Sequence, residues 1–94
     1  MKKPSDDMTE SEANDLLRTT MIGHVVVTRG VATHPERVAV ITAVRLFDDW
    51  SVGNDPYGEH DFGKVRVAGE DFFWTISTLE DGQKNLTIML AEEY

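Results

Sequence analysis

A chain of 94 residues has room for one domain with a single hydrophobic core. Its 17 acidic residues against nine Lys and Arg give a formal net charge of -8, so phosphates would be repelled and we expect no direct binding of DNA, RNA or an anionic membrane. The chain has no cysteine, which excludes disulfides, thiolate metal sites and thiol catalysis.

The N-terminus carries two lysines with no apolar stretch behind them, and no segment approaches the roughly 20 apolar residues of a membrane span. We therefore expect a cytoplasmic protein without an export signal. Residues 1–8 are polar and are expected to form a flexible tail. Residues 9–94 would then form the single folded domain.

A helix is predicted over residues 10–21. Thr9 and Glu12 have the spacing of a capping box, in which each side chain accepts from a backbone N–H of the first turn. Gly23 is suited to the left-handed conformation that ends a helix. The apolar positions fall on one helical face, and they are Ala13, Leu16, Leu17 and Met21.

The next two segments differ in how clearly they can be assigned. Residues 24–28 are short and β-branched, which predicts a strand that stops at Arg29-Gly30. Residues 35–47 have a strand-like composition, but Thr33 and Glu36 repeat the capping-box spacing in front of them. These start signals favour a helix over 35–47, with a strand as the alternative. Its buried face would hold Val40, Val44 and Phe47, flanked by Ala43 and Leu46, with Arg37 and Arg45 facing solvent.

The C-terminal third alternates in the manner of strands. Three strands are predicted over residues 62–67, 72–78 and 86–90, joined by turns at 68–70 and 79–83. Alternation places Phe72, Trp74 and Ile76 on one face, and Leu86, Ile88 and Leu90 on one face of the neighbouring strand. Together these elements predict an α+β fold with two helices packed on a four-stranded, mainly antiparallel sheet, a two-layer sandwich.

The segment after the second helix is strongly acidic and contains no Lys or Arg. Its carboxylates are Asp48, Asp49, Asp55, Glu59 and Asp61. The first two follow the C-terminal end of the predicted helix, where the helix dipole disfavours anions. Such a run costs folding energy through self-repulsion, so it either keeps the domain soluble as a solvated face or presents negative charge to a basic partner.

We predict that these acids contact a basic partner protein. Trp50 and Tyr57 lie in the same segment and are candidate aromatic anchors of the interface. Secondary contacts are expected from the two hairpin tips, at Glu70, Asp71, Glu80 and Asp81. The acidic segment and one tip would form a single anionic surface, able to occupy a nucleic-acid channel.

An alternative function is a small metal-dependent enzyme that uses Glu59, His60 and Asp61. The residue types suit a metal ion. In an extended segment, however, the first and third side chains share a face while His60 points to the other. Paired-carboxylate hydrolysis is a related alternative, but no neighbouring residue separates the pKa values of these acids. We therefore predict no catalytic, cofactor-binding or metal-binding residues.

Six segments of the chain carry a resemblance to a known family. They are Asn14-Asp15 with Arg18, and residues 27–31, 44–49, 54–63, 73–76 and 86–94. Together they resemble a bacterial family of unknown function whose short members occur on plasmids, prophages and chromosomes. The resemblance covers nearly the whole chain after residue 10, but the turn at 79–83 is tight where relatives have a longer polar insertion. The family has no assigned catalytic activity.

One class within this family is similar to anti-CRISPR proteins that act on type I-C systems. The resemblance implies a non-catalytic inhibitor that acts in the cytoplasm of the bacterial host. We expect a monomer without a cofactor, although the sequence leaves the oligomeric state open. Its partner would be a basic DNA-binding subunit of the Cascade complex, on which an acidic protein competes with the DNA backbone. Mimicry of DNA and steric blockade remain open, as does an interaction module with an unrelated basic partner.

Overall fold

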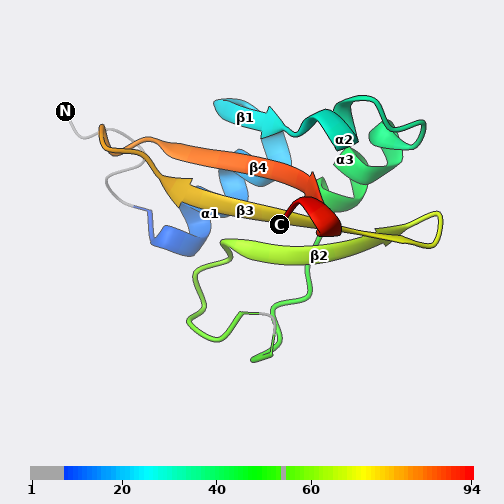
Figure 1. Ribbon diagram of the computed structural model, residues 1–94. Coiled ribbons are helices and arrows are strands. Elements are labelled where there is room, and N and C mark those ends of the chain that lie inside the picture. Colours follow the sequence, from blue (N-terminus) through cyan, green and yellow to red (C-terminus); the bar gives the residue numbers. More distant parts are fainter. Residues whose placement is uncertain (1–7, 54) are drawn as a thin grey trace.

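The computed structural model describes residues 8–53 and 55–94, so most of the predicted tail and Asn54 lie outside the described residues. A four-stranded sheet with strand order β1-β4-β3-β2 carries α1 and α3 on the same face (Figure 1). The elements are α1 (Glu10–Thr20), β1 (His24–Val27), α2 (Arg29–Ala32), α3 (Arg37–Arg45), β2 (Phe62–Val67), β3 (Glu70–Thr78), β4 (Lys84–Leu90) and the 3₁₀-helix η2 (Ala91–Glu93).

The sheet is mixed. β2, β3 and β4 are antiparallel neighbours, and β1 lies parallel to β4 at the edge. The predicted α+β class with a mainly antiparallel sheet is therefore confirmed. Among the described residues, no helix is both long and apolar enough to cross a membrane.

Helix α1 begins as predicted. The Thr9 hydroxyl accepts from the Glu12 N–H at 3.2 Å, and the Thr9 N–H donates to Glu12 Oε1 at 3.0 Å. The predicted end at Gly23 is wrong, because Met21 takes the left-handed conformation, with φ of 57°, and its N–H donates to the carbonyl of Leu17. Gly23 then turns the chain into β1.

The predicted single helix over 35–47 is shorter and is preceded by another. Arg29-Gly30 does not stop β1 in a turn but opens α2. The Thr33 hydroxyl donates to the carbonyl of Arg29 at 2.9 Å, so it completes α2 instead of capping α3. The buried positions Val40 and Val44 are confirmed. Leu46 is 74% exposed, against prediction, because it follows the last residue of α3.

The core lies between the helices and one face of the sheet. β3 alternates as predicted, with Phe72, Trp74 and Ile76 buried. Leu86 and Ile88 of β4 are fully buried beside them. The α1, α2 and α3 residues that complete this core are Leu17, Val31, Val40 and Val44. Burial of these apolar surfaces is the main stabilising contribution to the fold.

Glu93 fixes the C-terminal turn against the end of β1. Its carboxylate accepts from the Thr28 hydroxyl at 2.6 Å, the Leu90 N–H at 2.8 Å and the Gly30 N–H at 3.2 Å. These hydrogen bonds, the one from Thr28 foremost, lower the pKa of Glu93 from its usual value of 4.5. The ionised form is therefore the one that the fold favours.

Replacement of Glu93 by Gln is expected to make the protein less sensitive to acid. Because the pKa is lower in the folded than in the unfolded chain, the carboxylate stabilises the fold above the unfolded value of 4.5, and this contribution disappears as pH falls through the folded value. Thermal unfolding between about pH 7 and about pH 3 should show a smaller fall in Tm for Glu93→Gln than for wild type. Glu92→Gln is the matched control and should behave like wild type; equal slopes for all three proteins would contradict the proposed role.

Candidate binding surface

The loop between α3 and β2 is held against α1 by His60. The His60 ring lies between two carboxylates, with Nδ1 3.0 Å from Asp15 of α1 and Nε2 3.4 Å from Asp55. The ring also stacks on Trp50, with the ring centroids 3.8 Å apart and the planes 5° from parallel. These contacts join residues separated by up to 45 positions in sequence, and they fix the loop on the domain.

Arg18 of α1 holds Asp15 in place and connects α1 to the end of α3. Arg18 is only 3% exposed. Nη1 donates at 2.9 Å to the carbonyls of both Val44 and Arg45, and Nη2 donates to Asp15 at 3.1 Å. The cation therefore meets the negative end of the α3 dipole and faces the interior. It also lies 5.1 Å and 5.4 Å from the ring centroids of Trp50 and Trp74.

Backbone geometry completes the loop. His60 has φ of 56°, a left-handed conformation that costs energy for a residue with a side chain. The conformation is held by two hydrogen bonds, from the His60 N–H to Asp55 Oδ1 at 3.1 Å and from Asn14 Nδ2 to the Glu59 carbonyl at 2.9 Å. Asn14 itself is buried on α1.

Two of the predicted contact residues turn inward. Asp55 is buried, at 9% exposure, and its carboxylate holds His60. Trp50 is half-buried between His60, Phe47 and Trp74. Both side chains make their contacts within the domain, so neither is placed to contact a partner.

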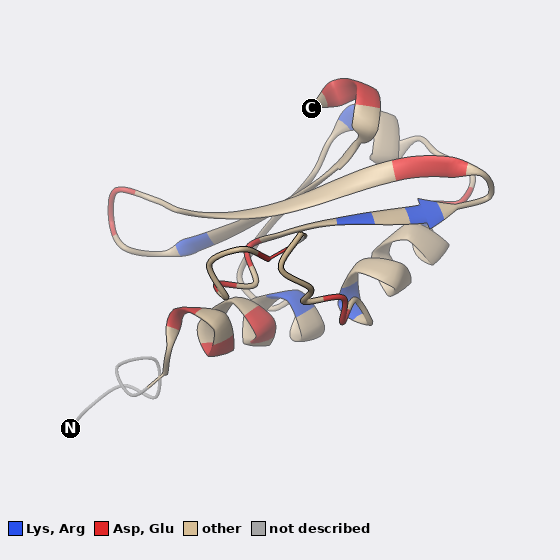
Figure 2. Cartoon of the chain, turned by 90° about the horizontal axis from the view of Figure 1, so that it is seen from below, with Lys and Arg blue, Asp and Glu red and all other residues tan. Residues whose placement is uncertain are grey.

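The other predicted residues of the loop are more accessible. Asp48, Asp49 and Glu59 are exposed, and Tyr57 is 86% exposed. Asp61 is half-buried where the chain enters β2, and its carbonyl accepts from the Ile76 N–H. α1 adds an exposed carboxylate that the sequence had indicated only as a helix cap, Glu12. We call Glu12, Asp48, Asp49 and Glu59 the acidic surface; Figure 2 shows α1 beside the loop with Asp and Glu on both.

The two hairpin tips lie at opposite ends of β3, about 27 Å apart for a strand of this length. Glu70 pairs with His34 at 3.0 Å and Asp71 with Arg66 at 2.8 Å, at the end far from α1. The tip that carries Glu80 and Asp81 lies at the other end, where Lys84 pairs with Glu10 of α1. Only the second tip is therefore close to α1.

The alternative metal site is not assembled. The His60 ring faces Asp15 and Asp55, and Glu59 points into solvent. Within residues 8–53 and 55–94, no group of three or more His, Asp or Glu side chains is placed to hold a metal ion.

Sequence comparison identifies the family. A family described as "Protein of unknown function (DUF3768)" matches residues 27–86. The chain belongs to this family. The match includes α3, the loop and β2 but not α1, so the family region contains His60 and Asp55 while Asp15 and Arg18 lie outside it. No curated protein and no solved structure matches the chain.

Proposed function

We propose that this DUF3768 protein is a non-catalytic binding module that docks its acidic surface on a basic protein. The observation that carries the proposal is the division of charge around α1. Arg18 directs its cation inward to the carbonyls of α3, whereas Glu12, which caps α1, and Glu59 of the loop are exposed. Negative charge is thereby left on the outside of α1 and the loop.

The net charge of -8 adds a long-range component. A field of this sign steers the protein toward a cationic surface and raises the association rate at low ionic strength. The surfaces that proteins use to bind DNA are the common cationic surfaces of a bacterial cell. An acidic module would compete there with the DNA backbone.

For the partner, we propose the DNA-binding surface of the type I-C Cascade complex, which would make the protein an anti-CRISPR inhibitor acting in the bacterial host. This identity is supported by the family resemblance of the sequence. The contact set differs from the one read from the sequence, because Asp55 and Trp50 hold the loop while Glu12 of α1 joins the exposed acids.

Charge reversal tests the proposal. The triple variant Asp48→Lys, Asp49→Lys and Glu59→Lys is expected to weaken binding to type I-C Cascade by about 100-fold or more, because each change replaces attraction by repulsion. The measurement is competition with labelled target DNA at low and at moderate salt, and co-purification with Cascade.

The control triple is Glu36→Lys, Glu70→Lys and Glu92→Lys, which changes net charge by the same amount away from the acidic surface. It should retain most of the binding, and both triples should keep a Tm near that of wild type. Equal losses in the two triples would reject the acidic surface. If the wild-type protein leaves DNA binding by Cascade unchanged at low salt, the Cascade assignment fails.

A further inference from the structure

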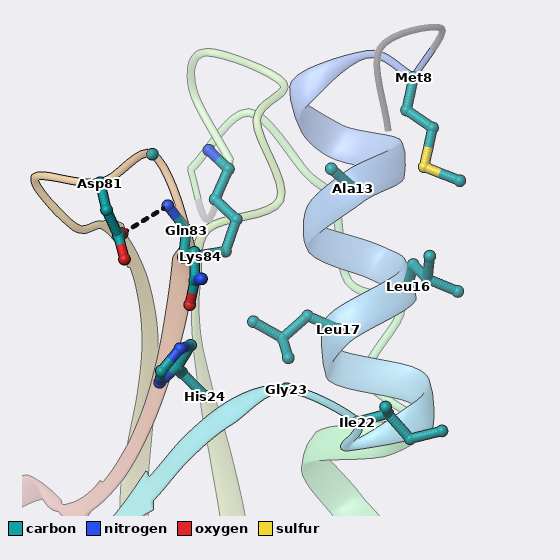
Figure 3. Close-up of a pocket in the computed structure, with 11 residues that line it drawn as sticks. Met8, Ala13, Leu16, Leu17, Ile22, Gly23, His24, Asp81, Gln83 and Lys84 are labelled. Carbon is teal, nitrogen blue, oxygen red and sulfur yellow. Dashed lines mark hydrogen bonds between the residues drawn. The ribbon is translucent and has the colours of Figure 1, made fainter. Parts of the chain in front are cut away.

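A groove of about 500 Å³ runs along the flank of α1 that faces away from the loop (Figure 3). Its floor and helix wall are apolar, formed by Met8, Ala13, Leu16, Leu17 and Ile22. The opposite wall comes from the start of β1, the turn before β4 and the first residue of β4, where His24, Asp81, Gln83 and Lys84 line it.

The apolar wall of this groove is open to solvent. Leu17 turns into the core and is 7% exposed, but its neighbour Leu16 is 50% exposed. Ile22, directly after α1, is 80% exposed. Single exposed apolar residues are ordinary on protein surfaces. Leu16 and Ile22, however, are two large exposed side chains in one groove with three further apolar side chains, which is typical of an interaction site.

The charges around the groove are negative on both sides. Glu12 precedes Leu16 by one helical turn and is exposed on the helix side. Glu80 and Asp81 are exposed on the turn side. Lys84 is the cation on the wall, and it pairs with Glu10 and donates to the Thr78 hydroxyl at 2.9 Å. The groove is thus apolar at the bottom and flanked by carboxylates.

We propose that this groove receives a basic amphipathic helix of the partner protein. This inference rests on the proposed function and assigns the secondary structure of the partner segment. Apolar side chains spaced at three and four residues on that helix would pack on Leu16 and Ile22. Lys and Arg on its flanks would reach Glu12 on one side and Glu80 and Asp81 on the other.

The charge pattern selects this occupant over others. A second copy of the chain would bring a net charge of -8 toward the same carboxylates, which is repulsive. An anionic lipid surface is repelled for the same reason. α1 itself has 11 residues, or about 16 Å, so a partner helix of about three turns matches the length of the groove.

The test uses a fluorescent peptide of about 14 residues made of Lys and Leu with helical amphipathic spacing, and fluorescence anisotropy at two salt concentrations. A peptide of the same composition with the spacing scrambled is the ligand control. The amphipathic peptide should bind at least about tenfold more tightly than the scrambled one, because only the former presents an apolar face to the groove.

The groove variants are Leu16→Ser with Ile22→Ser, and Ile22→Ser alone. Each is expected to weaken peptide binding several-fold, the double by about tenfold. The matched control is Val38→Ser with Leu46→Ser, because both residues are exposed apolar side chains on and after α3. The control should bind like wild type. Unfolding temperatures establish that the variants are folded, and the Ile22 variant, at 80% exposure, gives a readout even if the double variant unfolds.

Two results overturn the inference: equal binding of the amphipathic and scrambled peptides, or equal binding by groove and control variants. Neither result depends on Cascade. Conversely, if the groove binds the amphipathic peptide but the wild-type protein does not bind Cascade, the groove stands and the Cascade assignment falls.

Discussion

The Arg18→Met variant is expected to lose about 3–5 kcal/mol of unfolding free energy, because a buried guanidinium and its hydrogen bonds to two backbone carbonyls are removed. Methionine retains an unbranched apolar stem but none of the guanidinium donors. The carbonyls of Val44 and Arg45 would lose a donor at 2.9 Å each, and Asp15 would lose its cation at 3.1 Å. Arg18 is 3% exposed, so water does not readily replace these bonds.

Urea denaturation measures this loss, and for a domain of this size it corresponds to a fall in Tm of roughly 12 °C or more. Arg37→Met is the matched control, since Arg37 is exposed on α3 and should cost no more than about 0.5 kcal/mol. A second readout is hydrogen exchange of the His60 amide, which should accelerate in the Arg18 variant because Asp15 loses its support. Equal stability of the two variants would show that the α1–α3 connection does not depend on the guanidinium.

The parts of the fold that could be predicted from sequence are those set by local patterns. α1 follows from its capping box and apolar spacing, and β3 follows from alternation. The predicted start of the second helix is wrong because the Thr33 hydroxyl can either cap a following helix or complete a preceding one. The structure uses it for α2, through its bond to the Arg29 carbonyl.

The site was harder to predict because it depends on contacts between distant residues. The acidic loop is a feature of the sequence, but only its pairing with α1 distinguishes the outward Glu59 from the inward Asp55. Asp15 and Asn14 meet the loop 45 positions later in the chain, and nothing in local spacing indicates that pairing. The sequence signal for such a contact is the polar group Asn14, Asp15 and Arg18, whose spacing places all three on one flank of α1.

Gly63→Ala is expected to destabilise the protein by about 2–3 kcal/mol, the cost of overpacking a close-packed core. A Cβ atom at this position would lie 2.4 Å from Trp74 Nε1, 2.7 Å from Trp74 Cε2 and 2.8 Å from Phe47 Cζ. Trp74 is fully buried, so its ring cannot move toward solvent to make room for the added methyl group. Its ring is also 6.1 Å from that of Trp50 by centroid, so a displacement would reach the His60 stack and the loop.

The control for this variant is Gly53→Ala in the loop before β2, where a Cβ atom meets nothing within 4 Å. It should leave the unfolding free energy within about 0.5 kcal/mol of wild type. Because Gly63 touches the core and Gly53 only solvent, the pair separates the packing of Trp74 from general effects of replacing glycine.

Comparable stability of the two variants would mean that β2 can shift away from Trp74, and the loop would then be less firmly coupled to the core than these contacts imply. If Gly63→Ala also weakens binding at the acidic surface while Gly53→Ala does not, the orientation of the loop carboxylates depends on the packing of Trp74.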